Sequence, residues 1–159
     1  MTSLADTALF FRLAMRVGLL TKSDVARWAQ SVIAGAPTAE FPLTELASAE
    51  AVELAALDEL LGSLPGEREP HLPGRLVLAL VNRRVELGAI TPRRAAVVAK
   101  AIGAVQELSE DEYFEADWLD DDYQLVVSGV YGDLESHDLH ARALLATCAP
   151  YASGLPSTL

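Results

Sequence analysis

Apolar side chains recur every three or four residues along most of the chain, the spacing of helices that bury one face. In the first half this spacing predicts helices at about 4–17, 21–33 and 49–61, with a short one opened by Pro42. Thr21 would cap the second helix. The buried faces would carry Leu4, Ala8, Phe11, Ala14 and Met15, then Val25, Trp28, Ala29, Val32 and Ile33, then Val52, Ala55, Ala56, Leu60 and Leu61.

The second half repeats this pattern. It predicts helices at about 75–87 and 91–102, a helix opened by the capping box Ser109 to Glu112, another starting at Asp120–Asp122, and a last one that Ser136 caps and Pro150 ends. We expect Phe114, Trp118 and Tyr113 to point inward. The Val-rich stretch after Asp122 could form a strand, but no partner strand is visible. The fold class predicted is all-α, a compact bundle or short solenoid-like array of about 7–9 helices.

Glycine and proline mark the breaks between these helices. Gly18 and Gly88 stand where a left-handed residue would end a helix, and Gly35 with Pro37 would end the second one. The clearest loop is 63–74, with three Pro and two Gly in twelve residues. We predict a single helical domain over 1–159, with a subdomain boundary in this loop as the alternative.

A weak internal repeat relates the two halves at an offset of 70 residues. Gly18, Thr21, Ala26 and Ala29 recur as Gly88, Thr91, Ala96 and Ala99. Any antiparallel helical hairpin that stops with Gly and starts with Thr would show this pattern. The alternative is two related hairpins in a duplicated, solenoid-like array.

Charge is distributed very unevenly along the chain. Residues 1–106 hold 11 basic and 11 acidic residues, whereas 107–159 hold 12 acidic residues and one basic residue, Arg142. The whole net charge of −11 therefore arises in the last third. All 12 acids lie between Glu107 and Asp138. Carboxylates at this density repel one another and lower stability unless nearby cations offset the repulsion.

Aromatic side chains interleave with these acids. One interpretation is a solvated acidic face with its aromatics in the core. The other is a binding surface for a basic protein, where acids steer association and aromatics act as anchors. The candidate partner-binding residues are Asp111, Glu112, Tyr113, Glu115, Asp117, Trp118, Asp120, Asp121, Asp122 and Tyr123.

A basic hairpin precedes the acidic segment. Six basic residues and one acid lie between Arg75 and Lys100. Arg93 and Arg94 fall in the first turn of a predicted helix, where cations oppose the dipole, so a compensating anion is expected. With Arg83 and Arg84 they form a candidate patch complementary to the acidic segment, of the same chain or of a second copy. Nucleic acid is disfavoured as the anion by the overall negative charge.

The sequence offers no recognisable catalytic or metal-binding motif. The aspartates at 117–122 lack the spacing of a calcium loop, and His137 with His140 gives too few ligands for zinc. The lone Cys148 excludes an internal disulfide, and no run is long and apolar enough for a membrane span. We therefore expect a cytoplasmic, bacterial-type protein without a signal peptide, a cofactor or a metal.

The windows Gly18–Ile33 and Pro42–Ala47 resemble small helical proteins of bacterial polymorphic toxin systems. In that family, acidic immunity proteins block a cognate toxin, and the resemblance implies that role without assigning residues. The function expected first is thus a protein-binding module, in concrete form an inhibitor of a basic toxin or enzyme. The alternatives are a structural or regulatory homo-oligomer, and a helical enzyme that uses His71, His137 or His140.

Overall fold

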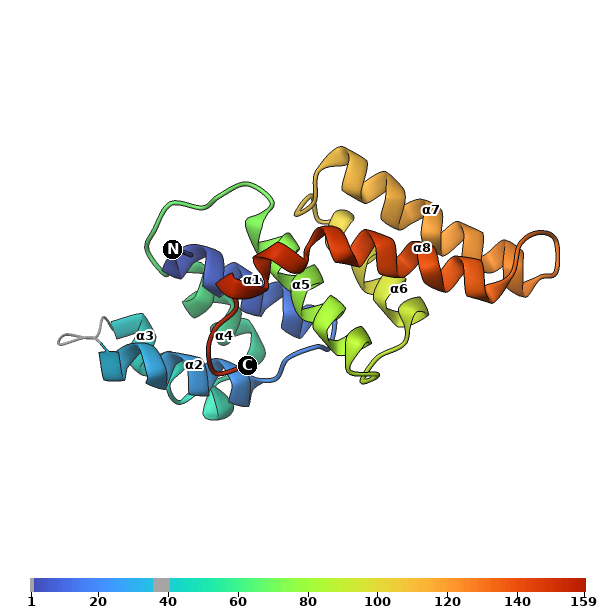
Figure 1. Cartoon of the computed structure of the whole chain (residues 1–159). Coiled ribbons are helices and arrows are strands. Elements are labelled where there is room, and N and C mark those ends of the chain that lie inside the picture. The colour runs from blue at the N-terminus through green and yellow to red at the C-terminus, as the bar shows by residue number, and fades with distance from the viewer. Residues whose placement is uncertain (1, 36–40) are drawn as a thin grey trace. The chain divides into compact units, whose positions relative to one another are not determined.

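The computed structural model describes residues 2–35 and 41–159, and over these the protein consists of helices joined by turns, without strands (Figure 1). The predicted all-α class is confirmed. The eight α-helices of the described part are α1 (Leu4–Arg16), α2 (Lys22–Gly35), α3 (Phe41–Leu46), α4 (Leu54–Gly62), α5 (Leu72–Glu86), α6 (Pro92–Gly103), α7 (Glu110–Val127) and α8 (Leu134–Thr147), and two short 3₁₀ helices span Ala49–Ala51 and Ala149–Gly154. None of the described helices is long and apolar enough to cross a membrane.

The chain divides into two compact units. Unit 1 takes in the described residues up to Glu69 together with Gly154–Leu159, and unit 2 is Pro70–Ser153. The division lies inside the Pro- and Gly-rich loop 63–74, where the sequence suggested a subdomain boundary.

Unit 1 is built from α1 to α4. Helix α1 packs on α4, and α2 packs on α3. The aromatic rings of Phe10, Phe11 and Trp28 are buried, with the Phe11 and Trp28 ring centroids 4.9 Å apart. At the surface, Arg12 donates two hydrogen bonds to the Asp58 carboxylate and so ties α1 to α4.

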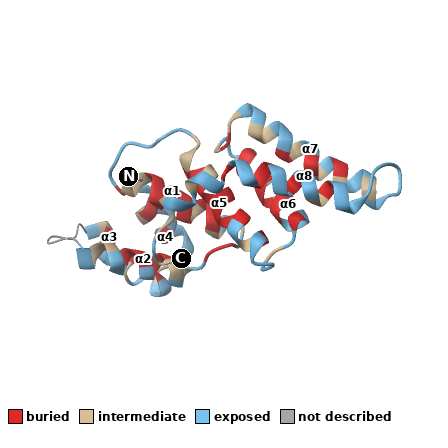
Figure 2. Cartoon of the chain, viewed as in Figure 1, coloured by how far each residue is buried: buried red, intermediate tan, exposed pale blue. Residues whose placement is uncertain are grey.

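Unit 2 is built from α5 to α8, with α5 innermost. Every residue from Leu76 to Asn82 is buried, and the burial map shows α5 as an almost continuous buried stretch (Figure 2). Helices α7 and α8 form an antiparallel hairpin that packs on α6, while α8 also packs on α5. The hairpin tip, residues 127–136, is exposed throughout.

The turns that join α1 to α2 and α5 to α6 have matching geometry. Gly18 and Gly88 adopt φ of 71° and 69°. The Gly18 amide donates to Met15 O and that of Gly88 to Val85 O, both at 3.0 Å, and Leu19 and Ala89 donate to Ala14 O and Arg84 O, both at 2.8 Å. Each donor and acceptor pair recurs 70 residues later. Three helix contacts also occur in equivalent places in the two units. In unit 1, α1 packs on α4, α2 on α3, and α3 on α4; in unit 2, α5 packs on α8, α6 on α7, and α7 on α8.

Several predicted boundaries were wrong. Residues 110–127 form one continuous helix because the Asp120–Asp122 run lies mid-helix and starts nothing. Helix α8 is capped by Asp133, whose side chain accepts from the Ser136 amide at 2.9 Å, so Ser136 is not its cap. Helix α5 begins three residues earlier than predicted, and the predicted helix 49–61 is a 3₁₀ turn followed by α4. The expected break at Pro37 lies outside the described residues.

Candidate functional site

The acidic segment becomes helix α7, and its first turn is fixed by a capping box. Ser109 Oγ accepts from the Glu112 amide, and the Glu112 carboxylate accepts from the Ser109 amide at 2.8 Å. Arg75 on α5 donates to both Glu112 oxygens, at 2.8 and 3.3 Å. Burial alone would raise the pKa of Glu112, but the hydrogen bonds from Arg75 and Ser109 outweigh it, so this pKa is lowered.

Lys100 on α6 neutralises a second group of α7 acids. Its Nζ lies 2.9 Å from carboxylate oxygens of both Asp117 and Asp120, and 3.9 Å from one of Asp121. The hydrogen bonds that Lys100 donates to Asp117 and then to Asp120 raise its pKa. One cation thus offsets much of the repulsion along this side of the helix.

Asp122 points into the α7–α8 hairpin. Its Oδ2 lies 3.4 Å from Nδ1 of His137, and both side chains are buried. The Tyr123 ring meets the His137 ring edge-on, with centroids 5.3 Å apart, and the Arg93 guanidinium lies over the Tyr123 ring at 4.1 Å. These contacts join α8, α7 and α6.

Tyr113 covers the end of α6. It packs so closely on Gly103 that a Cβ at Gly103 would lie 2.3 Å from Tyr113 Cδ2. Tyr113 therefore belongs to the packing of α7 on α6.

The predicted partner-binding residues divide between two sides of α7. The inner side, turned to the rest of unit 2 and engaged with α5, α6 or α8, consists of Glu112, Tyr113, Asp117, Asp120, Asp122 and Tyr123. The outer side, which we call the outward face of α7, carries exposed Asp111, Glu115, Trp118 and Asp121, together with Phe114 and Leu125. Two of these still reach a neighbouring helix, since Trp118 lies beside His140 of α8 and Asp121 lies 3.9 Å from Lys100 Nζ of α6. Within the described residues, no cation lies within ion-pair distance of Asp111 or Glu115.

The expectation that Phe114 and Trp118 point inward was wrong. Phe114 is 58% and Trp118 is 49% exposed, whereas Ala116 and Leu119 are buried. The side chains at 116, 119 and 123 face the core, and those at 114, 118 and 125 lie on the opposite side of the helix. Exposed large apolar side chains that share one face are a feature of interaction surfaces.

The four arginines of the predicted basic patch lie on two helices, α5 and α6. Arg93 stacks on Tyr123 within the chain, while Arg83 and Arg84 lie in the last turn of α5 and Arg94 follows the Thr91 cap. Within the described residues, Arg75 and Lys100 form ion pairs with α7, and the sequence did not single out either of them. A signal was present, since both belong to the basic hairpin, but their pairing with α7 depends on the tertiary fold.

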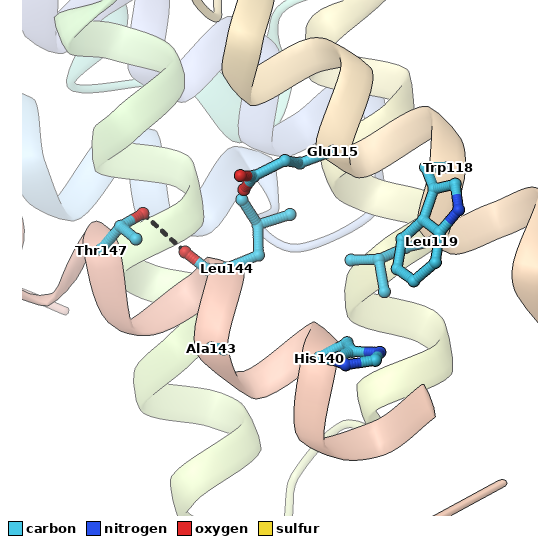
Figure 3. Close-up of a pocket in the computed structure, with 7 residues that line it drawn as sticks. All are labelled: Glu115, Trp118, Leu119, His140, Ala143, Leu144 and Thr147. Carbon is cyan, nitrogen blue, oxygen red and sulfur yellow. Dashed lines mark hydrogen bonds between the residues drawn. The ribbon is translucent and has the colours of Figure 1, made fainter. Parts of the chain in front are cut away.

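A groove of about 420 Å³ runs between the outward face of α7 and α8. Figure 3 shows Trp118 and His140 at one end and Thr147 at the other, with Leu119 and Leu144 along the wall. Glu115 and Ala143 complete the lining. The Trp118 and His140 rings lie 5.5 Å apart. Sequence reasoning missed the α8 side of this groove, although Ala143 and Thr147 recur at helical spacing after His140.

The three histidines sit in different surroundings. His71 precedes α5 with a left-handed φ of 63°, His137 is buried against Asp122, and His140 is exposed beside Trp118. Over the part of the chain that the structure describes, no three His, Cys, Asp or Glu side chains gather as a metal site would require. His137 and His140 are one turn apart on α8, and each contacts α7, His137 at Asp122 and His140 at Trp118.

Comparison with known proteins adds nothing to this description. No protein-family model, no curated protein and no solved structure matches the chain. A functional assignment therefore has to rest on the chemistry of the chain's own residues.

Proposed function

We propose that this chain is an acidic, helical protein-binding module whose partner presents a basic surface, and that the outward face of α7 makes the contact. The acids of this face would attract the basic partner before contact. Once the partner has docked, the Trp118 side chain would be buried in the interface and anchor it. The proposal keeps the protein-binding role expected from the sequence but restricts the contact to the candidate residues that lie on the outward face of α7.

The observation that supports the proposal is the division of α7 into two sides. The inner acids are matched by Arg75, Lys100 and His137, so the unit stabilises its own fold with them. Asp111 and Glu115 have no such match among the described residues, and they lie beside half-exposed Trp118 and Phe114. Unpaired carboxylates beside exposed aromatics are complementary to a protein surface that carries cations and an apolar patch.

An immunity-type inhibitor of a basic toxin is the concrete form of this proposal. If the toxin is a nuclease, carboxylates of the outward face would take the place of nucleic-acid phosphates in its binding site. The alternative of a homo-oligomer held by Arg93 and Arg94 has less support, because Arg93 stacks on Tyr123 of its own chain and Lys100 binds its own Asp117 and Asp120.

The test removes charge from the outward face alone. The variant Asp111→Asn/Glu115→Gln/Asp121→Asn is compared with Glu45→Gln/Glu59→Gln/Glu67→Gln, which removes three exposed charges from unit 1. The probe is a synthetic Lys- and Leu-containing amphipathic peptide of about five helical turns. Stopped-flow association should slow about tenfold at low salt for the first variant, with a flatter salt dependence, and stay near wild type for the second.

Equal association rates for both variants and the wild type would overturn the proposal. An equal slowing of both variants would also overturn it, because the effect would then come from net charge and not from a particular face.

A further inference from the structure

The groove between α7 and α8 has apolar walls, and acidic side chains lie along its α7 edge. Trp118, Leu119 and Leu144 form the apolar walls. Glu115 supplies the carboxylate of the described lining, and His140 is its other titratable side chain. Asp111, one helical turn before Glu115, continues the negative edge along α7.

The walls of this groove suit a third helix. Two packed antiparallel helices leave a furrow into which the side-chain ridge of another helix fits. Ala143 keeps the α8 wall low, so a backbone can approach closely there. Exposed apolar side chains extend the surface on both sides, Phe114 on α7 and Leu139 on α8, at 58% and 61% exposure. At about 420 Å³ the groove is large enough to bury a bulky apolar side chain.

The negative charge along the α7 edge of the groove favours a helix that carries basic side chains. Asp111 and Glu115, on the α7 edge of the groove, are exposed, and neither lies within ion-pair distance of a cation in the described part of the chain, so this edge keeps its negative charge. A phospholipid surface with anionic head groups or a nucleic-acid backbone would be repelled by it. A helix with Lys or Arg beside its apolar face would be attracted, and its cations would meet Glu115 and Asp111.

We infer that this groove binds the apolar face of a basic amphipathic helix of the partner protein, with one large apolar side chain seated against Trp118, Leu119 and Leu144. The inference rests on the proposed function and specifies the partner's secondary structure. It predicts recognition by helical spacing, with apolar residues at i, i+3, i+4 and i+7, in addition to charge.

Two exposed alanines of α8 provide a matched test. Ala143 lines the groove, whereas Ala146, three residues later on the same helix, does not. Gln at either position is neutral and favours helix, so Ala143→Gln should narrow the groove while Ala146→Gln serves as control. Thermal melts monitored by circular dichroism should show both variants folded, because both positions are exposed.

Titration calorimetry then uses two peptides of identical composition, the amphipathic probe and a shuffled version without helical spacing. We expect Ala143→Gln to weaken binding of the amphipathic peptide about tenfold, Ala146→Gln to leave it within about twofold, and the shuffled peptide to bind weakly to all three proteins. Equal affinity of wild type and Ala143→Gln would overturn the groove as the binding site, and so would equal affinity for the two peptides.

These failures can be told apart from failure of the proposed function. If the charge-neutralised outward face slows association but Ala143→Gln has no effect, the groove inference is wrong and the acidic contact stands. If neither peptide binds the wild-type protein at low salt, both proposals are overturned.

Discussion

Asp122 Oδ2 lies 3.4 Å from His137 Nδ1, and this buried pair joins the two helices of the α7–α8 hairpin. Tyr123 and Arg93 extend the contact from α7 to α6. The hairpin that carries the outward face is therefore held to the body of unit 2 by polar groups as well as by apolar packing. Rigid support of this kind lets a binding surface keep its shape.

The first prediction concerns the energetic coupling of this pair. Asp122→Ala and His137→Ala should each lower the free energy of unfolding by about 1–3 kcal/mol, because each leaves a buried polar partner unsatisfied. The double variant should lose less than the sum, with a coupling of about 1 kcal/mol or more from denaturant unfolding. Asp121→Ala is the control, since its side chain is 72% exposed. Strict additivity would contradict the pairing.

The second prediction concerns acid stability. Glu112 has a lowered pKa, so its ion pair with Arg75 stabilises the fold above the ordinary glutamate value of 4.5 and is lost as pH falls through the lower, folded-state pKa. Glu112→Gln keeps an acceptor for the Ser109 amide but removes the charge. At pH 7 it should unfold more easily than wild type by about 0.5–1.5 kcal/mol, and the difference should shrink below about pH 4.5. Denaturant melts that differ equally at pH 7 and pH 3 would refute this account.

The third prediction separates the inner acids from the outer ones. Lys100→Met should release Asp117 and Asp120 from their shared cation while keeping good helix propensity at position 100. Local negative charge then increases, so the basic peptide should associate faster at low salt, even though repulsion among the α7 acids makes the protein easier to unfold. A slower association with Lys100→Met would mean that Lys100 itself belongs to the contact surface.

Local signals in the sequence identified much of the fold. The Ser109–Glu112 capping box, the Thr91 cap and the left-handed Gly18 and Gly88 each act over a few residues, so each can be recognised without tertiary information. The 70-residue offset was also visible, and the two turns that it relates share the same hydrogen bonds, which are common where a helix ends at a left-handed glycine.

Which face of α7 is buried was harder to predict, because this helix has apolar residues on two sides. Ala116 and Leu119 form one row, while Phe114 and Trp118 form another, and the choice between them depends on where α6 and α8 pack. Helical geometry separates Asp120, Asp121 and Asp122. Consecutive residues differ by about 100° around a helix, so three adjacent aspartates cannot share one binding face. In the structure Asp120 contacts Lys100, Asp121 lies mainly in solvent, and Asp122 contacts His137.

The most direct test of the central claim uses the protein's two tryptophans. Trp28 is 4% exposed in unit 1 and Trp118 is 49% exposed on the outward face, so the two indole N–H resonances report on different places. When the basic amphipathic peptide is titrated into ¹⁵N-labelled protein, we predict that the Trp118 resonance shifts to saturation while the Trp28 resonance stays in place. Saturable binding that leaves the Trp118 resonance unmoved would contradict the account.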